Sequence, residues 1–144
     1  MFEILPFEDA KKYLLKALSV YERLVITNPQ MYKLPLAGAY KNLATIYHDI
    51  GNFSESVKYN LQSLEILKEI AINHPEIYEE ELAGTWGNLS CTYLHMQLLP
   101  EAQDCALKAI EIYEKLAVIQ PNTYNIDLAK QLSRFGWTGI RPAV

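Results

Sequence analysis

Apolar residues recur along most of the chain at the spacing of a helix with one wide buried face. The first run falls at Leu14, Leu18, Tyr21 and Val25, in steps of four, three and four residues. Pro29 ends this run, because proline cannot donate to the turn above it and disfavours a helical residue before it. A helix is therefore expected over about residues 8–27.

Five more segments carry the same helical spacing. A connector at 30–34 leads to Pro35, which suits the first turn of a helix that stops at Gly51, where glycine fits the left-handed position after a helix end. The loops are short, so successive helices are expected to fold back antiparallel. Further helices are expected at about 54–73, 80–96, 100–120 and 126–134, and the last stretch, 135–144, loses the pattern and is expected to be irregular.

One phrase of the sequence recurs at a fixed distance. Pro29, Pro75 and Pro121 are 46 residues apart, and a tyrosine follows each of them three positions later. A fixed period of this size indicates a solenoid, whose units bury their apolar faces by stacking on each other. The chain is therefore expected to be all-α, with about six helices in antiparallel pairs. They form a single repeat domain over 1–144: a half repeat at 7–29, full repeats at 36–75 and 82–121, a half repeat at 126–134 and the irregular tail.

Composition narrows the classes of partner. The formal charge of −4 is spread over 144 residues without a basic block, which argues against nucleic-acid binding through phosphates. Two cysteines are too few for a disulfide framework at this length, so a reducing compartment is expected. The first residues, MFEILPFEDAKK, lack the regions of a secretory signal, and no apolar run approaches the roughly 18 residues of a membrane span. A cytoplasmic protein without membrane contact is expected.

Two segments carry a family signature. Residues 86–93 (WGNLSCTY) and 102–106 (AQDCA) resemble the tetratricopeptide pattern W-x-x-L-G-x-x-Y followed by A-x-x-x-F. The 46-residue period is similar to the long repeats of kinesin light chains and of bacterial tetratricopeptide proteins. The resemblance covers about residues 7–134, and it implies a right-handed superhelix of helix pairs.

The sequence also departs from that family pattern. Asn60 and Ala106 stand where a bulky aromatic is usual, and Gln97 stands where the preceding repeat has Gly51. HEAT and armadillo repeats, which run about 40–47 residues, are the rival by length. They typically have a kinked first helix, and the helix that Pro35 is expected to open would carry no interior proline.

The resemblance implies a binding groove lined by the first helix of each pair. Asn42 and Asn88 hold the position at which family members often bond a peptide backbone, and a carboxamide offers both donor and acceptor. The alternative is that these side chains cap a neighbouring helix or face water. Lys130 and Arg134 suit an acidic or carboxylate-ended segment, although cations near a helix end also compensate its dipole. The expected groove residues are Lys41, Asn42, Thr45, His48, Asp49, Asn88, Cys91, His95, Lys130 and Arg134.

No catalytic motif, and no cofactor motif, stands out. Cys91 and His95 lie four apart on one helical face, as two metal ligands would, and His48 is the nearest candidate for a third. A closed zinc site takes four ligands, so a polar pair facing the groove is preferred and no metal is expected. We expect a protein that is not an enzyme and that needs no cofactor.

Two functions remain. The first is a scaffold that binds a peptide or protein in the groove, and the alternative is a structural unit that forms homo-oligomers through its terminal helices. Exposed apolar stripes mark such interfaces, and a second copy or the chain's own ends, 1–5 and 136–144, are the candidates to cover them. The stripes are expected at Ala10, Leu14, Ala17 and Leu18 on the first helix and at Leu128, Leu132, Phe135 and Trp137 on the sixth.

Overall fold

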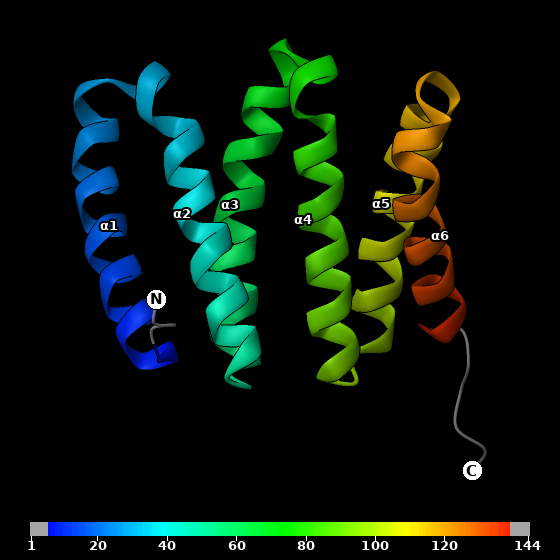
Figure 1. Cartoon of the computed structure of the whole chain (residues 1–144), viewed down its shortest axis with the longest axis horizontal. Coiled ribbons are helices and arrows are strands. Elements are labelled where there is room, and N and C mark those ends of the chain that lie inside the picture. The colour runs from blue at the N-terminus through cyan, green and yellow to red at the C-terminus, as the bar shows by residue number, and fades with distance from the viewer. Residues whose placement is uncertain (1–5, 139–144) are drawn as a thin grey trace, which may run out of the picture. The chain divides into compact units, whose positions relative to one another are not determined.

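The computed structural model describes the backbone of residues 6–138 and the side chains of residues 6–136. This part of the chain is all-α and contains no strand (Figure 1). None of its helices is both long enough and apolar enough to cross a membrane. The helices are α1 (Phe7–Thr27), α2 (Pro29–Asp49), α3 (Phe53–Asn73), α4 (Pro75–His95), α5 (Leu99–Ile119) and α6 (Pro121–Thr138).

The recurring prolines begin helices, and the connectors expected after them do not exist. α2, α4 and α6 start at Pro29, Pro75 and Pro121, where the sequence predicted starts near residues 35, 80 and 126. Proline costs little at the first helical position, because its missing N–H would have no partner there and its φ already fits. One proline thus ends the preceding helix and opens the next, with a single residue between them.

Asn28 shows how such a junction is built. It has an extended φ of −145°, and its side-chain oxygen accepts a hydrogen bond from the Met31 backbone N–H at 3.2 Å. This is the usual role of an asparagine at a helix start. Pro35 then lies inside α2, so the prediction of a helix without an interior proline is wrong. Its missing N–H removes one hydrogen bond from the second turn.

α6 extends further than the sequence predicted. The sequence predicted an irregular stretch from residue 135, but the helix continues to Thr138. Gly136 is tolerated because a glycine inside a helix costs only about 1 kcal/mol relative to alanine. Residues 1–5 and 139–144, which include most of the segments expected to cover the ends, lie outside the described residues.

Contacts divide the chain into two compact units, residues 1–66 and 67–144. The division falls within α3, between its first two-thirds and its last part. The single repeat domain and the handedness of a superhelix stay predictions.

In the first unit, α1 and α2 run antiparallel and share one core (Figure 1). Leu43, with no exposed surface, lies at its centre. α3 joins α2 through two buried serines: Ser56 Oγ donates to the Ala44 carbonyl at 2.7 Å, and Ser63 Oγ donates to the Ala37 carbonyl at 2.9 Å. The buried members of this core are Leu18, Leu36, Ala39, Tyr40, Leu43, Ala44 and Tyr59.

The apolar stripe of α1 packs against α2 and is not an open surface. Leu18 is buried in the core formed with α2, and Leu14 packs against that core, so the expectation that both are exposed is wrong. The helical spacing was read correctly, but the same face already meets α2. The large apolar side chains that α1 does expose are Phe7, Tyr13, Val20 and Ile26, which are 50%, 57%, 43% and 79% exposed.

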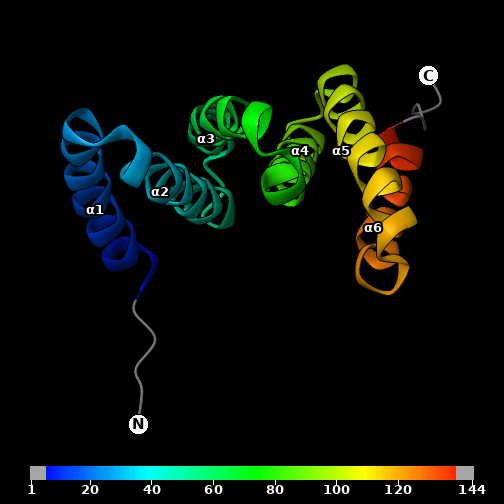
Figure 2. The ribbon, with the colours of Figure 1, turned by 90° about the horizontal axis from the view of Figure 1, so that it is seen from above.

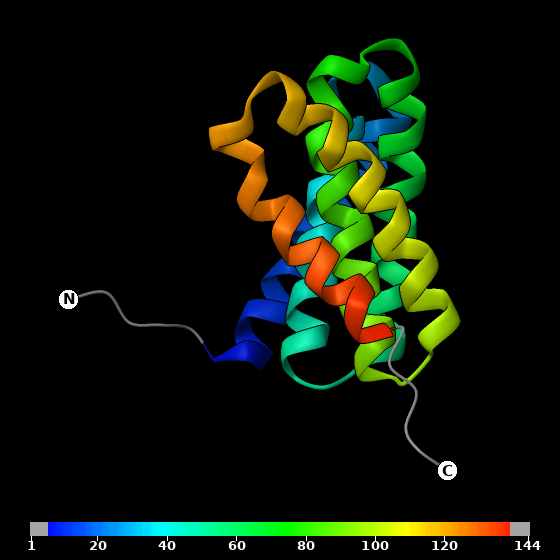
Figure 3. The ribbon, with the colours of Figure 1, turned by 90° about the vertical axis from the view of Figure 1, so that its right-hand side faces the viewer.

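In the second unit, α5 packs against both α4 and α6 (Figure 2, Figure 3). Its contact face is made of alanines, and Ala102, Ala106 and Ala109 have no exposed surface. Ser90 Oγ donates to the Ala102 carbonyl at 2.8 Å. Small side chains on α5 thus let α4 approach, and Leu89 of α4 is fully buried beside this contact.

The two turns between paired helices have the same geometry and different residues. Gly51 has φ of 84°, and Gln97, 46 positions later, has φ of 60°. Both turns close with equivalent backbone hydrogen bonds: Asn52 N–H donates to the Tyr47 carbonyl, and Leu98 N–H donates to the Tyr93 carbonyl. A side chain in this left-handed region meets its own backbone, so Gln97 carries a cost that Gly51 avoids.

Gln97→Gly should therefore stabilise the protein by about 1 kcal/mol, because it removes this conformational cost. Chemical denaturation monitored by circular dichroism measures the change. The matched control is Gly51→Gln, which should destabilise by a similar amount. A loss of stability in Gln97→Gly would mean that the Gln97 side chain contributes more than its backbone strain costs.

Candidate functional site

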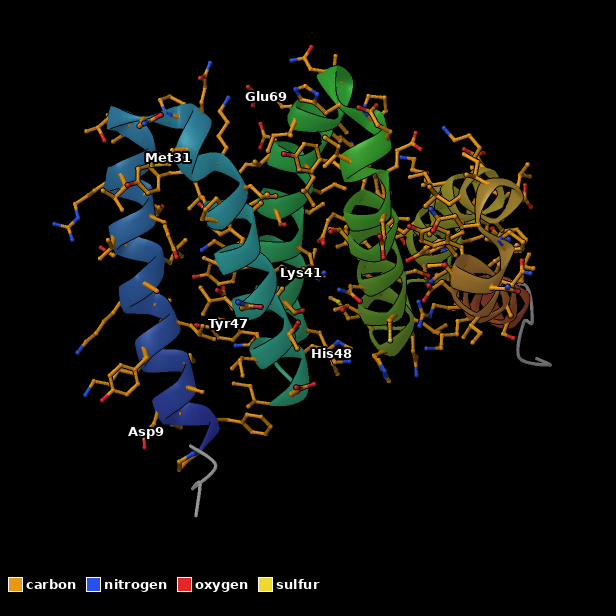
Figure 4. All side chains as sticks on the ribbon, turned by 45° about the horizontal axis from the view of Figure 1, so that its top comes forward. Asp9, Met31, Lys41, Tyr47, His48 and Glu69 are labelled. Carbon is orange, nitrogen blue, oxygen red and sulfur yellow. The ribbon has the colours of Figure 1, made fainter. Side chains whose placement is uncertain are left out.

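The expected groove residues of the first unit lie on the last three turns of α2. Tyr47 points to the α1 side of this helix, whereas Lys41 and His48 lie on another side (Figure 4). Asn42, Thr45 and Asp49 are exposed, and Lys41 and His48 are half-buried. The stripe of polar residues is therefore separate from the face that packs on α1.

Two of these side chains are already engaged within the first unit. Thr45 Oγ1 donates to the Lys41 carbonyl at 3.1 Å, one turn back in the same helix. The His48 ring meets Phe53 edge to face, with centroids 5.2 Å apart. Asn42 differs from them, because its carboxamide is exposed while the next residue, Leu43, is fully buried.

The second unit repeats this contrast on α4. Asn88 is exposed and Leu89, which follows it, has no exposed surface. His95 is also exposed and Cys91 is half-buried. On α6, Lys130 is exposed and Arg134 is half-buried. All ten expected residues thus retain some solvent contact, as a binding surface requires.

Arg134 has a partner that the sequence did not reveal. Its Nη1 donates to the Gly87 carbonyl at 2.8 Å and to Gln131 Oε1 at 3.1 Å, which ties α6 to α4. Gln131 is 7% exposed, and its amide nitrogen lies where a side chain on Gly87 would be. Lys41 occupies the position 46 residues before Gly87. The change from Lys41 in one repeat to Gly87 in the next was the signal in the sequence that another helix approaches at Gly87.

The recurring tyrosine in the first turn of α6 makes internal contacts. Tyr124 Oη donates to Glu80 Oε2 at 3.0 Å, and this bond to a carboxylate is the main reason that the pKa of Tyr124 is raised. Its ring lies 6.4 Å from the ring of Tyr113. Burial, with the carboxylates of Asp127 and Glu80 nearby, raises the pKa of Tyr113 to about 12. Both phenols therefore stay protonated at neutral pH.

Cys105 is not a reactive thiol. Burial on α5 raises its pKa to about 11, and the neighbouring lysines only partly offset this effect. Since the thiolate is the nucleophile, a thiol with this pKa is unreactive at neutral pH. Cys91, on the polar face of α4, is the more accessible of the two cysteines.

Gly87→Ala and Gly84→Ala should change stability in opposite directions. A methyl group at Gly84 makes an ordinary contact, 3.9 Å from Tyr113 Oη, so Gly84→Ala should gain about 0.5–1 kcal/mol from lower backbone entropy. At Gly87 the methyl group lies 2.5 Å from Gln131 Nε2 and must displace that amide from Arg134. Gly87→Ala should be about 1–2 kcal/mol less stable than Gly84→Ala, the usual cost of disturbing a buried hydrogen bond. Urea denaturation measures both, and equal stabilities would show that Gln131 moves aside at no cost.

Comparison with known proteins agrees with this architecture. The model of the Tetratricopeptide repeat family matches residues 36–76 and 82–118, more than half of the chain, with starts 46 residues apart. This match decides against the HEAT and armadillo alternative, although α2 does contain a proline. No curated protein matches the chain.

A solved structure has the same fold. The crystal structure of BtubC (BKLC) from P. vanneervenii superposes with a TM-score of 0.61 at 18% sequence identity. The match covers 94% of this chain and 54% of that protein, so this chain spans about half of its length. The helix-pair packing, the serine and alanine contacts and the two matched repeats together lead to one assignment. The chain belongs to the tetratricopeptide repeat family.

Proposed function

We propose that this protein is a non-catalytic interaction module that binds an extended segment of a protein or peptide. Each unit offers its own part of the proposed surface: the polar stripe on α2 in the first unit, and the polar stripe on α4 and α6 in the second. Tetratricopeptide repeats mediate protein–protein interactions in general, and the family match supports that class of partner. The two free cysteines suit a reducing compartment such as the cytoplasm.

The observation that carries the proposal is the pairing of an exposed asparagine with a fully buried leucine. Asn42 precedes Leu43, and Asn88 precedes Leu89, 46 residues later. The buried leucine fixes the backbone, so the adjacent carboxamide is held toward solvent on a rigid helix. A carboxamide both donates and accepts, which matches the alternating N–H and C=O groups of an extended chain. This arrangement supports binding with little dependence on the ligand's side chains.

The charge on α6 favours an acidic or carboxylate-ended ligand. Lys130 is exposed, and Arg134 is half-buried one turn later. Nη1 of Arg134 bonds to α4, which restrains the guanidinium without using all of its five N–H donors. A restrained guanidinium loses less entropy when it binds a carboxylate through two parallel hydrogen bonds.

Peptide selection followed by titration tests this proposal. Twelve-residue peptides selected from a random displayed library on the full chain should bind the Asn42→Ala, Asn88→Ala double variant about tenfold more weakly, the loss expected from two hydrogen bonds. The unfolding free energy of the variant should stay within about 0.5 kcal/mol of the wild type, as is usual for surface substitutions.

The matched control is Asn73→Ala, an exposed asparagine at the end of α3 and outside the stripe. It should leave peptide affinity unchanged. Equal affinity of the double variant and the wild type would remove the asparagines from the binding surface. A destabilised double variant would show that they are structural residues.

Self-association is the second candidate function, and the exposed apolar residues of α6 favour it. Ile126 is 67% exposed and Leu132 is 48% exposed. Leu128 and Phe135 are half-buried, so the stripe expected on this helix is only partly open, and the side chain of Trp137 lies outside the described residues. Exposed isoleucine and leucine on one helix suit contact with a second copy of the chain.

Leu132→Glu should then lower the average mass measured by light scattering over a range of concentrations, because a buried carboxylate at an interface is costly. Leu107→Glu, on an exposed position of α5 that is 44% exposed, is the control and should not change the mass. A wild-type protein that is monomeric at every concentration would exclude this second function.

A further inference from the structure

A pocket of about 420 Å³ opens in the second unit, where the start of α4 meets the end of α5 and the start of α6. Glu76 and Glu79 line it from α4, Leu116 and Ile119 from α5, and Tyr124 from α6. Its volume falls in the range of small-ligand sites. It lies at the opposite end of α6 from Lys130 and Arg134 and shares no residue with the asparagine stripe.

The lining combines an apolar wall with carboxylates. Leu116 and Ile119 supply aliphatic surface, and Ile119 is 76% exposed, although an isoleucine gains from being covered. Glu76, Glu79 and Tyr124 belong to the same lining. A ligand that fits has an aliphatic stem and a positively charged end, as arginine and lysine side chains do.

The protein itself shows that Glu79 attracts a cation. Lys115 Nζ lies 2.9 Å from Glu79 Oε1, and the lysine side chain is 64% exposed while the glutamate side chain is 21% exposed. An exposed ion pair of this kind contributes little to stability, so an incoming cation can replace or join the lysine. The carboxylate of Glu79, the less exposed partner, would then pair with the cation of the ligand.

Tyr124 lines the pocket, and its side chain is held in place. Its hydroxyl group donates to Glu80 Oε2, and its ring contacts Tyr113, so two elements restrain its orientation. An aromatic face beside two carboxylates is suited to guanidinium, which stacks on rings while its N–H groups bond to oxygen. Lysine has no planar group that could stack on the ring, so arginine is favoured.

The acidic pair is not a requirement of the repeat. The positions 46 residues before Glu76 and Glu79 hold Gln30 and Lys33, whereas Tyr78 corresponds to Tyr124. The tyrosine therefore recurs with the fold, and the two carboxylates are particular to this junction. Packing alone does not explain them.

We propose that this pocket binds an arginine side chain of a partner protein, with apolar neighbours of that arginine resting on Leu116 and Ile119. The complementary charge and the aliphatic wall select the occupant. The site is independent of the peptide-binding stripe, so either proposal can fail without the other.

A peptide titration of the isotope-labelled full chain, followed by nuclear magnetic resonance, tests the pocket. Acetyl-Leu-Arg-Leu-amide should produce saturable shifts at the backbone amides of Glu79, Ile119 and Tyr124. The same peptide with citrulline, which keeps the shape but not the charge, should bind about tenfold more weakly. The lysine peptide should fall between them.

Three variants sharpen the test. The double variant Glu76→Gln, Glu79→Gln should lose about tenfold in affinity for the arginine peptide, and Lys115→Gln should gain a few-fold because it removes the competing ammonium. Glu111→Gln, an exposed glutamate of α5 outside the pocket, is the control and should bind as the wild type does. Equal binding of the citrulline peptide, an unaffected double variant, shifts confined to residues 130–134 or no saturable shift would each overturn the proposal.

Discussion

Close contact between paired helices depends on a serine hydroxyl that bonds to a backbone carbonyl on the other helix. In the first unit the donor is Ser56 on α3 and the acceptor is the Ala44 carbonyl on α2. In the second unit the donor is Ser90 on α4 and the acceptor is the Ala102 carbonyl on α5. These are the same two positions, 46 residues apart, with the roles exchanged. The repeat therefore preserves the bond and the small size of both residues, while either helix can supply the hydroxyl. A buried hydroxyl without a partner costs about 1–3 kcal/mol, so the bond and the close approach must be kept together.

This packing determines which side chains remain for binding. It buries Leu43 and Leu89 completely, and it holds the asparagine before each of them at the surface. In the second unit, charges of both signs lie along α6: it carries Lys130 and Arg134 itself, and Glu76 and Glu79 of α4 line a pocket with Tyr124 in its first turn. Two lysines complete the burial of Trp86: Lys68 and Lys108 place their ammonium groups 4.8 and 4.3 Å from its ring centre. Such cation–π contacts cover a large apolar side chain without removing the charges from water.

The period, the helix count and the buried face could be predicted from the sequence, because stacked repeats show their core positions as recurring apolar residues. The left-handed turn at Gly51 was also readable, since glycine favours that conformation. The helix starts could not be predicted. Proline, which has no backbone N–H and a fixed φ, can both end one helix and begin the next, and a sequence pattern does not separate these two roles. The tie between Arg134 and Gly87 was missed because it joins residues 47 positions apart in two different repeats. The exposure expected for Leu14 and Leu18 failed since the direction of a buried face depends on which neighbour it meets.

The lengths of the helices have a consequence for how such a chain can evolve. Each of α1 to α5 has 21 residues, and α2 and α3, like α4 and α5, are joined by three residues. One residue separates the second helix of a pair from the next proline. A residue inserted or deleted inside a helix would rotate every later side chain on that helix by about 100°, which follows from 3.6 residues per turn. Single-residue length changes are therefore penalised, whereas duplication or loss of a whole 46-residue unit keeps every contact in phase. Evolutionary change in this protein should therefore occur by substitution and by the gain or loss of whole repeats.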